Sequence, residues 1–423
     1  MRLSRFTLFF SAAVVFLLSA PTVLAASFEV ETFRPSAQHP LLLMAPREGG
    51  RASLTIIFDV GAMDDGPERG LTRVTQHALL HSNARIDYEK LALSAYGAAA
   101  TFDMHTGLHE SRFTLTAPTE EFDALARSLL TAILSPRIEA GRFEAALERA
   151  GNDSQPLDPG IWLELLLVRT LLDERRYKEP GLGSLAKIDG MPVETVREHL
   201  ARLMAPCNAT IIVTGRFNAK ALRKLVSGMR GGVPQKLPRP TLKLPFKRLA
   251  PAPREVQVLA YPIRIETPRH AAAARVLASL LEERLFRRFR NAGVGYGFAS
   301  QPLFTSSFDA LALLLPAQEK SGIDLGPFLR EEVRAVSEGQ LEPGDFERHQ
   351  QATLIRLRLD DQDSPRVAEE LRTARLRPAW YGPALPDALA SLTPEALREV
   401  ASSWLREESA IQIHFVTRLE AGE

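Results

Sequence analysis

The sequence repeats one order of elements after about 200 residues, and this duplication restricts the fold more than any other feature. Val193 to Glu198 (VETVRE) begins a helical pattern that leads into the apolar run from Ala209 to Val213. Pro394 to Glu399 (PEALRE) begins the same pattern 201 positions later and leads into Ala410 to Phe415. Helices predicted after Gly141 and Gly344 are separated by nearly the same offset. We therefore expect two similar domains of about 200 residues each.

The first half alternates strand-like and helix-like patterns, which indicates an α+β fold. Strands are predicted at 41–44, 52–60, 101–105 and 111–117, and helices at 70–81, 88–96 and 120–133. The turn at 47–50 predicts that the first two strands are neighbours. We expect each domain to be a mainly antiparallel sheet with helices covering one face.

The amino terminus has the pattern of a secretory leader. Arg2 and Arg5 precede the apolar run from Leu8 to Leu18, and Val23 to Ala25 resembles a cleavage site. We expect residues 1–25 to be removed and the protein to be periplasmic or secreted, although an uncleaved membrane anchor is the alternative. Loss of both arginines takes the formal charge from +1 to about −1, which gives no reason to expect nucleic-acid binding.

The predicted domains are residues 26–230 and 254–423, joined by a linker at 231–253. The linker contains six prolines and five basic residues but no acidic residue, so we expect an extended segment on the surface. Its basic character could attract an acidic partner. Cys207 is the only cysteine, so no intrachain disulfide can form, and we expect a buried, inert thiol.

The stretch from Gly70 to His81 (GLTRVTQHALLH) has apolar residues at helical spacing. It resembles the active-site helix of the pitrilysin, insulinase and mitochondrial-processing-peptidase family, whose inverted zinc motif is HxxEH. In this chain the motif is degenerate, because Arg73 and Gln76 replace the first histidine and the glutamate, and only His77 matches. The resemblance follows the order of elements through both halves.

These replacements remove the chemistry that a hydrolytic zinc needs. Arg73 cannot deprotonate, and a guanidinium about 4 Å from a dication would be repelled by roughly 8 kcal/mol at an effective dielectric constant of about 20. An amide at Gln76 cannot accept a proton from metal-bound water, a step typically worth ~10² to 10⁴ in rate. We expect no catalytic residue, metal ligand or cofactor in this chain.

The family's third zinc ligand is a glutamate about 75 residues after the second histidine. In this chain that distance ends within residues 151–155, where Asp153 is the only acidic residue. A rival metal site could use the pairs His77 with His81 and His105 with His109, since residues four apart share a helix face. Ordinary hydrogen-bonded histidines are the simpler interpretation.

The second half contains a pattern that resembles the family's substrate-contact motif, an arginine followed six residues later by a tyrosine. Here the pair is Arg290 and Tyr296. The arginine could bind a peptide carbonyl or carboxylate, and the tyrosine hydroxyl could steady the carbonyl under attack. The competing interpretation places Arg290 on a basic helix face with Arg284, Arg287 and Arg288.

Together, the resemblance implies the non-catalytic subunit of a heterodimeric zinc peptidase. A homologous partner with an intact HxxEH would supply the zinc, and this chain would supply Arg290, Tyr296 and part of the chamber wall. The substrates would be peptides. Two alternatives are open from the sequence: a stand-alone peptide-binding or scaffold protein, and an active hydrolase that uses His77, His81 and Asp153.

Overall fold

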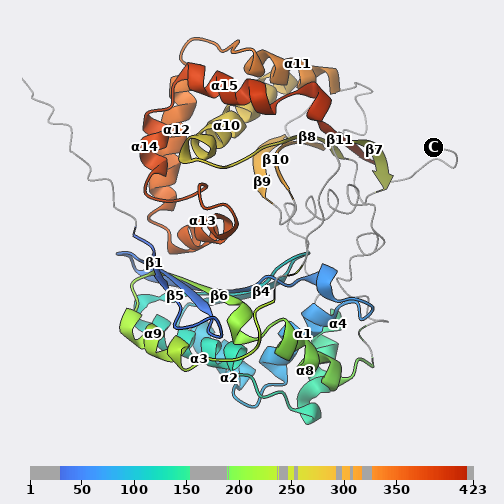
Figure 1. Cartoon of the computed structure of the whole chain (residues 1–423), viewed down its shortest axis with the longest axis vertical. Helices are drawn as coiled ribbons and strands as arrows, with labels where there is room; N and C mark the ends of the chain where they lie inside the picture. Colours follow the sequence, from blue (N-terminus) through green and yellow to red (C-terminus); the bar gives the residue numbers. More distant parts are fainter. Residues whose placement is uncertain are drawn as a thin grey trace, which may run out of the picture.

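The chain forms two β-sheets, and helices cover one face of each (Figure 1). The computed structural model describes residues 29–152, 188, 190–235, 237, 246–251, 256–291, 298–304, 308–316 and 326–416. The helices of each half lie mainly on the side of their sheet that points away from the other half, as Figure 1 shows. The α+β expectation is thus confirmed.

The first sheet has six strands in the order β1-β2-β6-β3-β5-β4. The parallel pair is β2 with β6, and the other pairs are antiparallel. The strands are β1 (Glu31–Phe33), β2 (Leu41–Pro46), β3 (Arg51–Phe58), β4 (Thr101–Thr106), β5 (Ser111–Pro118) and β6 (Ala209–Gly215).

Alternation along the strands separates the two faces of this sheet. On β3, Leu54, Ile56 and Phe58 belong to the first hydrophobic core, whereas Ser53 and Thr55 point to the other face. The helices among the described residues of this half are α1 (Leu71–His81), α2 (Tyr88–Gly97), α3 (Thr119–Leu134), α4 (Phe143–Asn152), α8 (Val193–Arg202) and α9 (Ala219–Ser227). Cys207 is buried near the start of β6, and burial raises the pKa of its thiol, as expected for an inert residue.

The second sheet has the order β7-β11-β8-β10-β9. Its strands are β7 (Phe246–Pro251), β8 (Val256–Pro262), β9 (Ala299–Phe304), β10 (Asp309–Pro316) and β11 (Ile411–Val416). The helices are α10 (Pro268–Asn291), α11 (Gly326–Ser337), α12 (Asp345–Asp360), α13 (Ser364–Leu376), α14 (Leu385–Ala390) and α15 (Pro394–Trp404). Short 3₁₀ turns lie at Ala62–Asp64, Ala140–Arg142, Pro206–Asn208 and Glu407–Ser409.

The strand order of the second sheet repeats that of the first. In each half, the last strand lies between two earlier strands, one parallel and one antiparallel to it. Strand β6 lies between β2 (parallel) and β3 (antiparallel), and β11 lies between β7 (parallel) and β8 (antiparallel). A hairpin then completes both sheets, β5 with β4 and β10 with β9. The internal duplication inferred from the sequence is therefore a duplication of sheet topology.

Two details differ from the sequence-based expectations. The strands predicted at 41–44 and 52–60 are not neighbours, because β6 inserts between β2 and β3. Residues 246–251, which lie within the predicted linker, form β7 at the edge of the second sheet. The predicted leader, residues 1–25, lies outside the described residues. None of the described helices combines the length and apolar character required to cross a bilayer.

Helix α13 belongs to the second half of the sequence but packs on β3 and β6 of the first sheet (Figure 1). Ile57 and Ile212 from the first sheet join the hydrophobic core of the second half, together with Val367 and Leu371 of α13. The Thr214 hydroxyl also donates to the backbone oxygen of Ser364 at 2.7 Å. One continuous core therefore connects the two halves.

Candidate functional site

Helix α1 carries the degenerate motif and is almost completely enclosed, with ten of its eleven residues buried. Its first turn is held by Asp65, whose carboxylate accepts hydrogen bonds from the backbone N–H groups of Gly70 and Thr72, each at 2.8 Å. The Thr72 hydroxyl donates to the same carboxylate at 2.6 Å. Gly70 adopts φ +89°, a left-handed conformation that favours glycine. These contacts fix the start of the helix that carries the motif.

Gln76, which the sequence resemblance aligns with the glutamate of HxxEH, acts as a structural link. Its Nε2 donates to the backbone oxygens of His105 at 3.1 Å and Arg112 at 3.2 Å. Its Oε1 accepts from the Thr106 hydroxyl. These contacts join α1 to the β4–β5 hairpin, and they require a donor, which a carboxylate lacks.

Arg73 and His77 are also buried, with only 8% and 5% of their surface exposed. A permanent positive charge at Arg73 opposes any nearby metal cation. The rings of His77 and His81 stack with their centroids 5.8 Å apart. Both histidines line a pocket of about 670 Å³ between α1, α2, β4 and α4, and its other lining residues include Tyr88, Phe102 and Glu148.

Two histidines in this region, His81 in the pocket and His105 on β4, are held in their neutral form. Burial, assisted by the charge of Arg149, lowers the pKa of His81 to about 4. Burial, together with Arg112, lowers the pKa of His105 to about 4. His109 is buried in the turn between β4 and β5.

The described residues do not fit a zinc ion at this position. No three His, Cys, Asp or Glu side chains in the described ranges lie close enough together to hold a metal ion. Asp153, which the rival hydrolase hypothesis requires, lies outside those ranges. The chemistry of Arg73 and Gln76 excludes the family's usual metal coordination and general-base step at their positions.

Glu148 is a residue of this pocket that sequence reasoning missed. It lies on α4, which packs against α1, and it lines the same pocket as His77 and His81. Counting from the family motif led to residues 151–155, so Glu148 fell outside the window. Only the packing of α4 on α1 shows that Glu148 faces the motif helix, because no local sequence pattern encodes that contact.

The second predicted site lies at the end of α10. Arg290 is exposed in the last turn of this helix and has no hydrogen bond or ion pair within the described part of the chain. Tyr296 lies outside the described residues, so the structure does not show whether the two side chains meet.

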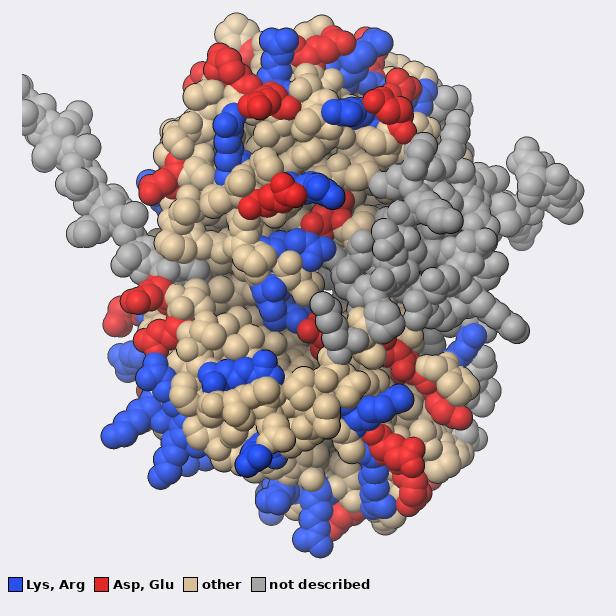
Figure 2. All heavy atoms as spheres, viewed as in Figure 1, with Lys and Arg blue, Asp and Glu red and all other residues tan. Residues whose placement is uncertain are grey.

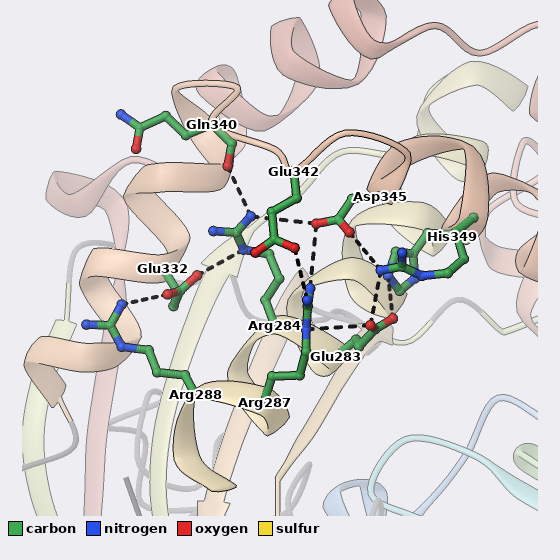
Figure 3. A network of polar contacts seen from close by, with 10 residues as sticks. Glu283, Arg284, Arg287, Arg288, Glu332, Gln340, Glu342, Asp345 and His349 are labelled. Carbon is green, nitrogen blue, oxygen red and sulfur yellow. Dashed lines mark hydrogen bonds and ion pairs between the residues drawn. The ribbon is translucent and has the colours of Figure 1, made fainter. Parts of the chain in front are cut away.

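The neighbouring arginines are engaged in a polar network that joins α10 to α11 and α12 (Figure 3). The Arg284 guanidinium contacts Glu332 at 2.9 Å, and Arg288 contacts the same carboxylate at 2.6 Å. Arg287 pairs with Glu342 at 3.1 Å and with Asp345 at 3.6 Å. The basic-face interpretation therefore applies to these three arginines, whereas Arg290 differs from them in having no acidic partner among the described residues.

Comparison with known proteins identifies the same type of fold. Residues 191–353 match the family model of the peptidase M16 inactive domain. No curated protein matches the sequence. A solved protease from Helicobacter pylori has a TM-score of 0.75 at 12% identity, over 92% of this chain and 99% of that chain.

Two further structures extend the comparison. A peptidase M16 inactive domain from Pseudomonas fluorescens has a TM-score of 0.72 at 16% identity, over 92% of this chain and 98% of that chain. The periplasmic protease PqqL from Escherichia coli has a TM-score of 0.70 at 13% identity, over 92% of this chain but 48% of that chain.

Proposed function

We propose that this chain is the non-catalytic subunit of a heterodimeric zinc peptidase, because its fold is that of solved M16-like peptidases and residues 191–353 match the peptidase M16 inactive domain. In this proposal a homologous partner with an intact HxxEH motif supplies zinc, water and general base. This chain supplies Arg290 and Tyr296 to bind the peptide, and it forms part of the chamber wall. The predicted leader would export it to the periplasm or beyond.

The observation that carries the proposal is the use of Gln76 as a hydrogen-bond donor to two backbone carbonyls. The residue at the position proposed for the general base, Gln76, therefore joins α1 to the β4–β5 hairpin. Together with the buried Arg73, this arrangement supports a role in which hydrolysis occurs on another chain.

The exposure of Arg290 supports a role for this residue in peptide binding. Its neighbours Arg284, Arg287 and Arg288 are paired with carboxylates, which hold the end of α10 against α11 and α12. Arg290 is exposed at this helix end and pairs with none of the described residues, and an arginine can bind a peptide carbonyl or carboxylate with two N–H groups.

The length of PqqL supports a paired arrangement. This chain covers 48% of that periplasmic protease, whose chain is thus about twice as long. Its first half alone, solved separately, is also similar to this chain, with a TM-score of 0.70. We propose that this chain and its partner together correspond to such a double-length unit.

Co-expression with an HxxEH-bearing homologue, followed by a peptidase assay, tests the proposal. The pair should cleave peptides, and Arg290→Ala should lower kcat/KM roughly 10- to 100-fold, the loss expected for a charge-assisted hydrogen bond. Arg356→Ala, an exposed position on α12, is the matched control and should leave kcat/KM unchanged. Assembly of the pair with equal cleavage after Arg290→Ala would refute the binding role.

A stand-alone peptide-binding protein is the second candidate, favoured by the pocket of about 670 Å³ beside His77 and His81. Failure of the chain to co-purify with any zinc-bearing homologue, combined with peptide binding by the chain alone, would support this candidate over the heterodimer.

A further inference from the structure

The outward face of α9 is basic along its whole length. Leu222 and Val226 are buried in the core of the first half, so this helix is attached by its apolar side. Lys220 and Lys224 are exposed one turn apart, and Arg223 lies beside them. The helix contains no acidic residue.

Basic residues from neighbouring segments extend this surface. Arg216 precedes α9 and Arg230 follows it, and both are exposed. Arg127 is exposed on α3, one turn after Asp123, whose carboxylate accepts from the backbone N–H of Asn218 at 3.1 Å. We call these six residues the α9 basic face: Arg127, Arg216, Lys220, Arg223, Lys224 and Arg230. Figure 2 shows Lys and Arg side chains gathered at the lower left of the view, where α9 lies in Figure 1.

Acidic neighbours neutralise only part of this charge. Arg223 forms an ion pair with Glu31. Hydrogen bonds from its own backbone and from Thr119 lower the pKa of Glu120, and the charge of Arg216 contributes to this shift. In contrast, Lys220 and Lys224 form no ion pair within the described residues. The surface therefore retains an excess of positive charge.

The sequence on both sides of α9 also contains basic residues without acidic ones. From His199 to Arg254 there are twelve Lys and Arg residues and no Asp or Glu, in a chain whose total formal charge is only +1. The rest of the chain therefore carries an excess of acidic residues. Five of these twelve residues, Arg216, Lys220, Arg223, Lys224 and Arg230, belong to the α9 basic face, and a surface of one sign attracts an anionic partner.

The composition of the face favours a lipid surface over a protein. Protein interfaces are enriched in aromatic residues and depleted of lysine. The large exposed apolar side chains of the described residues are Leu93, Tyr96, Val233, Ile355 and Leu359, and none of them lies on α9. Attraction to an anionic bilayer needs no such anchor, because each basic residue near the surface contributes independently.

We propose that the α9 basic face docks this protein on an anionic phospholipid surface. The apolar side of α9 is already buried, so the contact is electrostatic and peripheral, without insertion of the helix. The inference goes beyond the proposed peptidase role and requires only this chain.

Co-sedimentation of the purified chain with vesicles tests the proposal. Vesicles of phosphatidylcholine with about one third phosphatidylglycerol should bind the chain at low salt, and pure phosphatidylcholine vesicles should not. Binding should disappear near ~0.5 M NaCl, where charges are strongly screened. The double variant Lys220→Glu/Lys224→Glu should weaken binding by about tenfold or more.

Arg356→Glu/Arg358→Glu is the matched control, since it makes the same charge change at two exposed positions of α12. This control should bind like the original chain, and circular dichroism should show that both variants are folded. Absence of binding to the anionic vesicles, or equal weakening by both double variants, would overturn the proposal. Arg290→Ala should leave vesicle binding unchanged, so this result is independent of the peptidase assay.

Discussion

At the residue scale, Gln76 is a side chain that joins α1 to the β4–β5 hairpin. The amide satisfies two backbone carbonyls and one hydroxyl at once, a combination that needs both a donor and an acceptor. A glutamate at this position would place a buried carboxylate against the oxygens of His105 and Arg112. A glutamate here would therefore lose the hydrogen bonds that hold the hairpin to α1.

We expect Gln76→Glu to lower the free energy of unfolding by about 1 to 3 kcal/mol, because two buried carbonyls lose their donor. Urea denaturation of the purified chain measures this change. Gln351→Glu, at an exposed position of α12, is the control and should have little effect. A Gln76→Glu variant as stable as the original would show that the link between α1 and the hairpin contributes nothing.

His199 provides a test of pH dependence. Its Nε2 lies 3.2 Å from the Thr72 hydroxyl, and burial, assisted by Arg202, lowers its pKa from 6.5 to about 4. Because the folded state favours the neutral ring, the stabilisation is fully present above pH 6.5 and is lost as the pH falls toward 4.

Over that range the original chain should lose up to about 3 kcal/mol more of its unfolding free energy than His199→Gln, which cannot take up a proton. Urea denaturation at several pH values measures the difference. His81 and His105 also have lowered pKa values, but they remain in both proteins and cancel in this comparison. If the unfolding free energies of the two proteins changed equally with pH, His199 would not be the group responsible for the pH dependence.

At the scale of elements, α13 and the β4–β5 hairpin are joined by ion pairs. Glu110, in the hairpin turn, accepts from Arg372 at 3.0 Å and from Arg375 at 3.3 Å. Arg375 also pairs with Asp59. Burial opposes ionisation of Glu110, but the charges of Arg372, Arg375 and Arg112 together lower its pKa, so this carboxylate is ionised.

We expect Glu110→Ala to destabilise the protein by about 2 to 3 kcal/mol, since it leaves the partly buried guanidinium groups of Arg372 and Arg375 without this partner. Glu369→Ala is the control. Its carboxylate pairs with Arg372 but is 51% exposed, so its loss should cost less than about 1 kcal/mol. Denaturation midpoints compare the two variants, and equal losses would argue against a special role for the buried contact.

Local periodicity predicted most elements of the first half, because each strand or helix has one apolar side. The region 70–81 became α1, and 120–133 lies within α3. The position of β6 between β2 and β3 was not predicted, since a pairing across more than 160 residues leaves no local signal. At the site, the replaced motif residues were readable from the sequence, whereas Glu148 and the packing of α4 were not.

At the scale of the whole molecule, the duplication predicted two sheets, and the repeated strand order confirms it. It did not predict that the halves share a core. A repeat in sequence specifies similar units but carries no information on the surface through which they meet. Among the described residues, that surface includes α13, the inner face of the first sheet, and the ion pairs of Glu110.

The location of α13 has a consequence for how the polypeptide matures. Ile57 and Ile212 belong to the sheet completed by residue 215, yet the helix that covers them begins only at Ser364. During synthesis, about 150 further residues must emerge before this apolar surface is shielded. The nascent amino-terminal half is therefore incomplete on its own, and the last third of the chain finishes its folding.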